Sequence, residues 1–195
     1  MIHSHFTIRR RLPKHPTPGT VEKGTTVEVQ LPSRLGYERV AMATAASVAR
    51  LMGFREERVE DLRSAVAEAC INAIEHGNRL NEGLSVGVVL SAGPESLEEK
   101  VIDDGKGLKA LPPKPDIDRK IHGEEDPHGL GISLIQALVD EVEWVAGATG
   151  KGSYVRLVIW LNPPSLKTPS GAVFDKHALK ELASRTRQNP KETRQ

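Results

Sequence analysis

The sequence predicts an α/β fold, a two-layer α/β sandwich with a mixed, mainly antiparallel sheet. Two observations carry this prediction. Apolar residues alternate with polar ones in several short segments and recur at intervals of three and four in longer ones. These segments follow one another as strand, two helices, strand pair, helix and strand pair, an order typical of α/β domains. The chain has 195 residues, of which 38% are hydrophobic, enough to bury the core of one such domain.

The first half of the pattern predicts one strand and two helices. Strict alternation over 27–31 indicates a half-buried strand. Ser33 is expected to cap a helix that ends at Gly53. A second helix is predicted over 56–76; it is apolar on both flanks, so it should be largely buried. The apolar positions of the first helix are Tyr37, Val40, Ala41, Thr44, Ala45, Val48 and Leu51.

The second half predicts a strand pair, a helix and a second strand pair. Residues 84–90 and 97–103 alternate in polarity and are joined through a Gly-Pro turn. A charged, Pro-rich loop of about 20 residues follows, and a loop of that length in a compact domain is often a lid over a ligand. The remaining predicted elements are a helix over 131–140 and strands over 142–146 and 154–161.

Charge divides the chain into three parts, although the net charge is only +1. Residues 1–24 hold 5 basic and 1 acidic side chains, and we expect an extended basic arm there. Residues 25–163 hold 15 basic and 22 acidic side chains and form the predicted domain. Residues 164–195 hold 7 basic and 3 acidic side chains, a polar tail with at most one short helix near 174–187. The acidic domain excludes a nucleic-acid binder that works through a basic face.

Composition also bears on the compartment. No apolar run approaches the roughly 20 residues that span a bilayer, so we expect no membrane segment. The arginines near the N-terminus are not followed by an apolar stretch, so we expect no secretory signal. Cys70 is the single cysteine and cannot form an intramolecular disulfide. These features favour the cytoplasm.

Glycine gives the first indication of function, because eight of the 17 glycines lie between positions 105 and 152. Such clusters let the backbone approach a nucleotide closely. Three common phosphate loops are excluded, since each requires a glycine where an apolar residue stands. Those residues are Leu134 for a dinucleotide loop, Val145 for a P-loop and Val155 for a protein-kinase loop.

Polar residues on the second helix could form a site. Glu68, Asn72 and His76 follow at intervals of four, which places them in a line along one flank. A buried carboxylate and amide need partners, and a magnesium phosphate would supply them. The Asn carbonyl oxygen suits Mg²⁺, and a Glu one turn earlier could deprotonate a hydroxyl. The alternative is a helix flank that faces solvent.

Two further segments favour a nucleotide. Asp103 ends a predicted strand, and its carboxylate could accept a hydrogen bond from the exocyclic amine of adenine; an ordinary Asp-Gly turn is the alternative. Gly131 opens a helix whose free N–H groups and dipole could hold an anion. Ser153, at the mouth of the last strand, could donate to a phosphate or cap a tight turn.

The order of these segments resembles that of the N, G1, G2 and G3 boxes of the GHKL (Bergerat-fold) ATPases. Among those, the chain is most similar to the bacterial anti-sigma-factor serine/threonine kinases. The resemblance spans about residues 25–161 and leaves both basic tails outside it. The four segments are Glu68–Gly77, Asp103–Gly107, Gly129–Gly131 and Gly152–Ser153.

The resemblance implies a role for each residue. Glu68 would be the general base, Asn72 the Mg²⁺ ligand, and Asp103 the residue that reads adenine. ATP would bind under a mobile lid at about 108–128. The remaining nucleotide contacts would be Gly105, Gly107, Gly129, Leu130, Gly131 and Ser153.

The resemblance also implies partners. Family members phosphorylate a small antagonist (anti-anti-sigma) protein, sequester a sigma factor and form homodimers. We therefore expect an ATP-dependent serine/threonine kinase and anti-sigma factor. Two alternatives are an ATP-dependent module that binds partners without phosphorylating them and a standalone ATP hydrolase.

Overall fold

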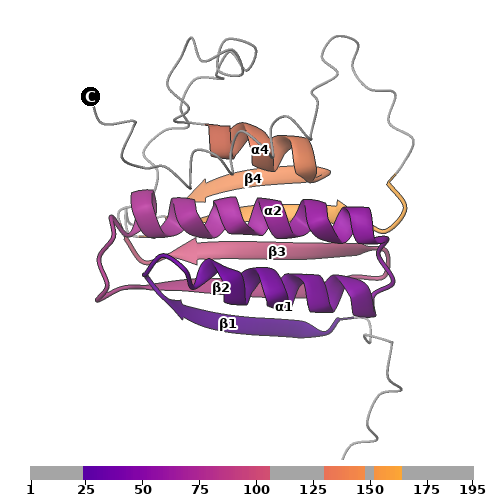
Figure 1. Ribbon diagram of the computed structural model, residues 1–195, viewed down its shortest axis with the longest axis horizontal. Helices are drawn as coiled ribbons and strands as arrows, with labels where there is room; N and C mark the ends of the chain where they lie inside the picture. Colours follow the sequence, from indigo (N-terminus) through magenta and orange to yellow (C-terminus); the bar gives the residue numbers. More distant parts are fainter. Residues whose placement is uncertain (1–23, 106–129, 148–151, 164–195) are drawn as a thin grey trace, which may run out of the picture.

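The computed structural model describes residues 24–105, 130–147 and 152–163 (Figure 1). The described strands are β1 (Thr26–Pro32), β2 (Ser85–Ala92), β3 (Ser96–Asp103), β4 (Glu141–Ala146) and β5 (Ser153–Trp160). The described helices are α1 (Glu38–Leu51), α2 (Glu56–Asn72), the π-helical turn η1 (Ala73–Gly77) and α4 (Leu130–Leu138). The predicted arm, lid, tail and helix near 174–187 lie outside the described residues, as do Gly107 and Gly129.

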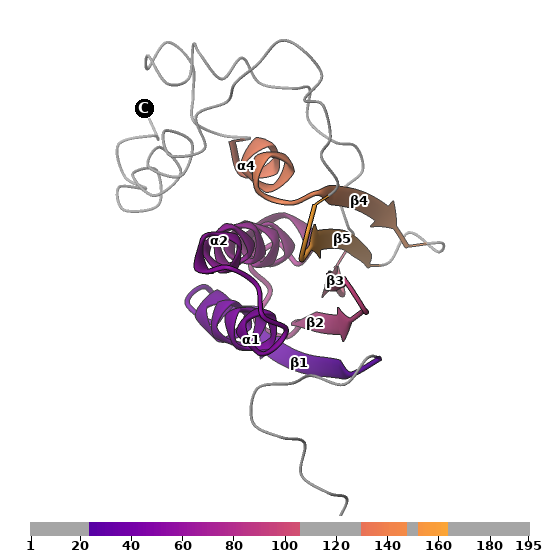
Figure 2. The ribbon, with the colours of Figure 1, turned by 90° about the vertical axis from the view of Figure 1, so that its right-hand side faces the viewer.

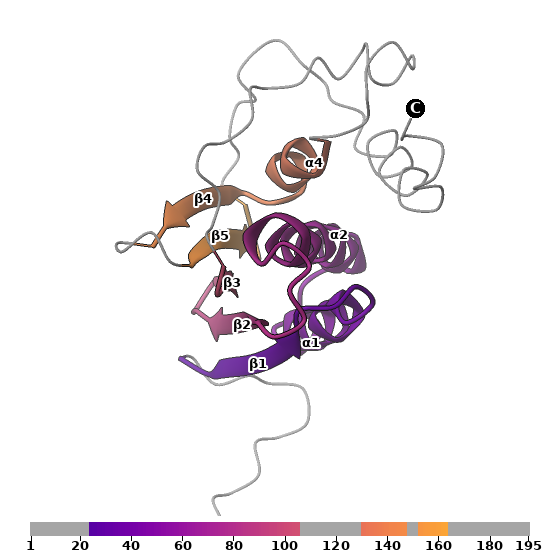
Figure 3. The ribbon, with the colours of Figure 1, turned by 90° about the vertical axis from the view of Figure 1, so that its left-hand side faces the viewer.

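The strands form one five-stranded sheet in the order β1-β2-β3-β5-β4. The views in Figures 2 and 3 show α1, α2 and α4 together on one face of this sheet. The predicted two-layer α/β sandwich is therefore confirmed. All four pairings among the described strands are antiparallel, so the parallel component of the expected mixed sheet is not found in this part of the chain.

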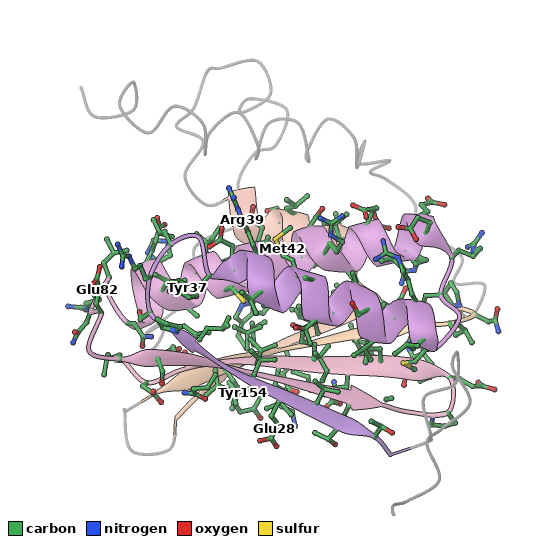
Figure 4. All side chains as sticks on the ribbon, turned by 60° about the horizontal axis from the view of Figure 1, so that its bottom comes forward. Glu28, Tyr37, Arg39, Met42, Glu82 and Tyr154 are labelled. Atoms are coloured by element: carbon green, nitrogen blue, oxygen red, sulfur yellow. The ribbon has the colours of Figure 1, made fainter. Side chains whose placement is uncertain are left out.

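Alternation along the strands explains the two layers. In β2 and β3 every second residue is buried, and these residues face the helices. The opposite sheet face carries half-exposed polar residues, and Figure 4 shows Glu28 and Tyr154 on that side. The largest fully buried apolar side chains are Leu62, Ile74, Leu90, Leu97, Leu134, Ile135, Leu138, Leu157, Ile159 and Val59.

Helix α1 differs from its prediction at the start. It begins at Glu38, and Ser33 lies in a preceding turn, where its N–H donates to the carbonyl oxygen of Leu84 at 3.2 Å. Gly36, with a φ of +100°, redirects the chain before the helix can form. The predicted stripe is wrong at three positions, since Tyr37, Val40 and Leu51 are exposed. The predicted positions Ala41, Ala45 and Val48 are buried, and Ala46 and Ala49 are buried as well.

Helix α2 is the central helix and packs between α1 and α4. Its first turn is fastened to the far end of α4 by Arg58, whose guanidinium donates to the Leu138 carbonyl oxygen at 3.3 Å. The same guanidinium pairs with Asp140, which also accepts the N–H of Trp160 at 2.8 Å. These bonds fix α2 relative to α4 and to β5.

One end of the sheet gathers the predicted site segments. Register pairs Asp103 with Ser153 and with Val86, so β3 ends where β5 begins and where β2 has just started. The η1 turn packs against β3 at this end. The antiparallel arrangement therefore brings together segments far apart in the sequence.

Candidate nucleotide site

Helix α2 presents two of the three aligned polar residues to the interior. Glu68 is buried and Asn72 is half-buried. His76, however, is exposed, so the predicted line of three is wrong at its last member. The physical reason is the π-helical turn η1, in which the N–H of Asn78 reaches the Ala73 carbonyl oxygen at 2.7 Å. This wider turn takes His76 out of the period that aligns Glu68 with Asn72.

The first turn of α4 lies against this pair. A Cβ built on Gly131 would stand 2.7 Å from Oε2 of Glu68 and 3.7 Å from Nδ2 of Asn72. Glycine at 131 therefore allows the carboxylate to come close to the beginning of α4. That end of a helix carries the positive pole of its dipole and N–H groups that favour anions. Leu130 is the first residue of α4.

Asp103 is the second buried carboxylate of the site, with 4% of its surface exposed. Its Oδ1 accepts the N–H of Gly105 at 3.1 Å, and its Oδ2 accepts the hydroxyl proton of Ser153. The Ser153 hydroxyl therefore orients Asp103. Each carboxylate oxygen keeps a second lone pair with which it could accept a bond from a ligand amine.

Glycines allow the close packing around Asp103. A Cβ on Gly77 would stand 2.5 Å from Cγ of Asp103, and one on Gly105 would stand 1.9 Å from the Gly77 carbonyl oxygen. Gly152 has a φ of +69°, and its N–H donates to the Gly105 carbonyl oxygen at 2.6 Å. Gly77 ends the Glu68–Gly77 segment, and no role in the site was expected of it. Its closeness to Asp103 arises from packing between η1 and β3.

A cavity of about 30 Å³ lies between η1, α2, α4 and the ends of β3 and β5. Asn72, Asp103 and Ser153 line it, so the structure brings three predicted residues together. Ile135 and Trp144 also line it and were not predicted as site residues. In the sequence these two residues show only apolar periodicity, which does not distinguish a core residue from one that lines a pocket. The cavity is partly open, and its volume is that of one or two waters, so a bound purine would extend beyond it.

The donor set fits a magnesium ion that is shared with phosphates. The described residues contain no group of three His, Cys, Asp or Glu side chains able to hold a metal ion by themselves. Mg²⁺ in nucleotide sites, however, usually takes only one or two protein ligands and completes its shell with water and phosphate oxygens. Asn72, beside Glu68 and the start of α4, offers one such hard oxygen.

Comparison with known proteins gives a consistent result. A family model described as a histidine kinase-like ATPase domain matches residues 31–159. Serine-protein kinase RsbW of Bacillus mycoides (strain KBAB4) is 30% identical over 128 residues, which cover 63% of this chain and 79% of that protein. Serine-protein kinase RsbW of Bacillus licheniformis is 31% identical over 125 residues, covering 60% of this chain and 75% of that protein.

A solved structure is also similar. It contains the RsbU and RsbW domains of Rv1364c from Mycobacterium tuberculosis, with 22% identity and a TM-score of 0.49. The match covers 72% of this chain and 33% of that one, so the chain spans about a third of that structure's length.

No helix in the described part of the chain is long and apolar enough to cross a membrane.

Proposed function

The chain belongs to the histidine kinase-like ATPase family, and from that premise we propose that it is an ATP-dependent protein serine/threonine kinase. Its protein substrate would be a small antagonist of the anti-anti-sigma type, and its second partner would be a sigma factor that it sequesters. The relatives named serine-protein kinase support the activity class. The work of such a protein would take place in the cytoplasm, where sigma factors act.

One observation carries the proposal: Glu68 stands beside the N-terminal turn of α4 while Asp103 lines the neighbouring cavity. A nucleotide whose base meets Asp103 would direct its phosphates toward α4, since that helix start favours anions. Glu68 would then lie where the terminal phosphoryl group meets an incoming hydroxyl. A module that only binds nucleotide does not require a carboxylate at that point.

The proposed reaction assigns one task to each residue. Asp103 accepts a hydrogen bond from the exocyclic amine of adenine, which the keto oxygen of guanine could not provide. The hydroxyl oxygen of the substrate Ser or Thr attacks the γ-phosphorus, the bond between that phosphorus and the oxygen retained by ADP breaks, and Glu68 takes the hydroxyl proton.

Asn72 would hold the magnesium ion through its side-chain carbonyl oxygen. The ion, when bound, neutralises charge on the phosphates during transfer. Glu68 is buried beside the helix start, and low water access to its carboxylate would favour transfer to a protein hydroxyl over hydrolysis.

The test is phosphoryl transfer from γ-labelled Mg-ATP to each small candidate antagonist encoded near the gene. We expect label on a Ser or Thr of one candidate. Glu68→Gln should keep ATP binding and lose at least about 100-fold in transfer rate. Glu75→Gln, a substitution of an exposed carboxylate in η1, is the matched control and should transfer normally.

Each other result points to a different conclusion. Binding of ATP with no label on any candidate would favour the non-catalytic module, and ATP turnover without a partner would favour a standalone hydrolase. Asn72→Ala should abolish the magnesium dependence of ATP binding, and unchanged Mg-ATP affinity would refute its role as a ligand. We also propose a homodimer, which a monomeric mass in light scattering would contradict.

A further inference from the structure

Asn78 is a buried polar residue that the proposed reaction does not use. It follows η1 directly and has only 2% of its surface exposed. Its Oδ1 accepts the N–H of Asp104 at 3.0 Å, and its Nδ2 donates to the Ser85 carbonyl oxygen at 2.8 Å. One side chain therefore joins the end of the central helix to the start of β2 and to the turn after β3.

That turn carries the residue proposed to read the base. Asp103 is the last residue of β3, and the N–H of Gly105 donates to its carboxylate. Asp104 stands between them and its N–H donates to Asn78, so Asn78 holds the middle of the turn. Gly105, the next residue of the turn, packs against the Gly77 carbonyl oxygen. The turn therefore contacts both Gly77 and Asn78 at the end of η1.

A second hydrogen bond supports the turn from β2. The Ser85 hydroxyl donates to Oδ2 of Asp104 at 2.6 Å, and Gln30 of β1 donates to that hydroxyl oxygen. Asn78 and Ser85 thus hold Asp104 by its main chain and its side chain respectively. Of the two, only Asn78 acts on the peptide unit that sets the direction of Asp103 and Gly105.

The backbone after Asn78 is strained in a way that fits this role. Arg79 and Leu80 have φ values of 55° and 57°, a left-handed conformation that is uncommon outside glycine. The N–H of Leu80 donates to the Ile74 carbonyl oxygen at 2.8 Å, which folds the chain back over η1. Such strain persists where surrounding contacts determine the conformation, and it is frequent at functional sites.

We propose that Asn78 is a positioning residue for base recognition: it holds the Asp103–Gly105 turn so that the Asp103 carboxylate meets the amine of adenine. This inference rests on the proposed function, because it requires that Asp103 read the base. Asn78 does not line the cavity, so its effect on the nucleotide passes through Asp103.

The test compares the affinities for Mg-ATP and Mg-GTP by calorimetry, together with the melting temperature. Asn78→Ala removes both side-chain bonds and should lower the ATP to GTP affinity ratio roughly tenfold or more, because a misplaced carboxylate loses the amine. Asn78→Ser is a milder replacement and should also lower the ATP to GTP affinity ratio. Asn78→Asp keeps an oxygen facing the Asp104 N–H and should retain the ratio within about threefold.

Asn81→Ala is the matched control. Asn81 lies three positions further on, and within the described residues its side chain accepts only the N–H of Gly83 in its own exposed turn, so the variant should keep the wild-type ratio. A purely structural role for Asn78 would lower the melting temperature and leave the ratio unchanged.

The outcomes separate the two proposals. A folded Asn78→Ala or Asn78→Ser protein with the wild-type ratio overturns the inference, as does Asn78→Asp with a collapsed ratio. Wild-type protein that does not bind Mg-ATP, or that binds Mg-GTP equally well, contradicts the proposed function itself.

Discussion

Glu99 gives a prediction that depends on the fold alone. It lies in the middle of β3 and has no exposed surface, and neither carboxyl oxygen has a hydrogen-bond partner among the described residues. Its strand neighbours in register are Leu90 and Leu157. Burial raises the pKa of the Glu99 carboxyl to about 8. Burial also raises the pKa of the Cys70 thiol in α2, and a charge on the nearby Glu99 would raise it further.

The direction in which stability changes with pH follows from the difference between the pKa values of Glu99 in the folded and unfolded chains. The unfolded chain releases the Glu99 proton near the ordinary glutamate pKa of 4.5, whereas the folded chain retains it up to about 8. The contribution of Glu99 to stability is therefore fully present below pH 4.5 and is lost progressively as pH rises toward 8. Each pH unit in that window costs about 1.4 kcal/mol, so the loss reaches about 3 kcal/mol at pH 7 and about 5 kcal/mol above pH 8.

The assay is urea unfolding between about pH 5 and pH 7.5, followed by tryptophan fluorescence. Glu99→Gln removes the titrating group at nearly constant volume, so its free energy of unfolding should fall less steeply with pH than that of the wild type, by about 1.4 kcal/mol per unit. Glu98→Gln is the control on the other face of β3. The pKa of Glu98 is lowered by its bonds to Arg156 and Lys100 against the opposing effect of burial, so this variant should keep the wild-type slope. Parallel curves for Glu99→Gln and the wild type would refute the reasoning.

Three further predictions concern the site and its support. Gly131→Ala should fold, since the atom that the new Cβ meets is the end of a side chain, but phosphoryl transfer should drop because that Cβ displaces Oε2 of Glu68; normal transfer would contradict that contact. Arg58→Ala should lower the free energy of unfolding in urea by about 3 kcal/mol, because it leaves Asp140 without its cation. Asp140→Asn keeps an acceptor for the Trp160 N–H and should lower that free energy by less. In Trp160→Phe protein, Mg-ATP should change the emission of Trp144, which lines the cavity; in Trp144→Phe protein, the emission of Trp160 should stay constant.

Much of the fold could be predicted because strand and helix periods are properties of the backbone. The predicted start of the central helix, Glu56, and the predicted end of the third strand, Asp103, coincide with those observed. The start of α1 could not be predicted, since Ser33 is a common capping residue that here lies buried in a turn against the start of β2. The π-helical turn that exposes His76 has no marker in the sequence either.

The site was predictable where a residue type carries the chemistry, and less so where packing does. Structure places Asn72, Asp103 and Ser153 around one cavity, with Glu68 and Gly131 next to Asn72. Their roles toward ATP and magnesium stay predictions. Trp144 was missed because its place in the cavity depends on the pairing of β4 with β5, and Gly77 was missed because its need for glycine comes from Asp103 across the fold.

A calorimetric titration of wild-type protein and Asp103→Asn with Mg-ATP and Mg-GTP measures adenine recognition by Asp103. We predict that the wild type binds Mg-ATP at least about tenfold more tightly than Mg-GTP, and that Asp103→Asn loses this preference, because the amide no longer offers the charged acceptor that Ser153 and Gly105 orient. An Asp103→Asn protein with the wild-type preference, or a wild type that does not bind Mg-ATP, would contradict this prediction.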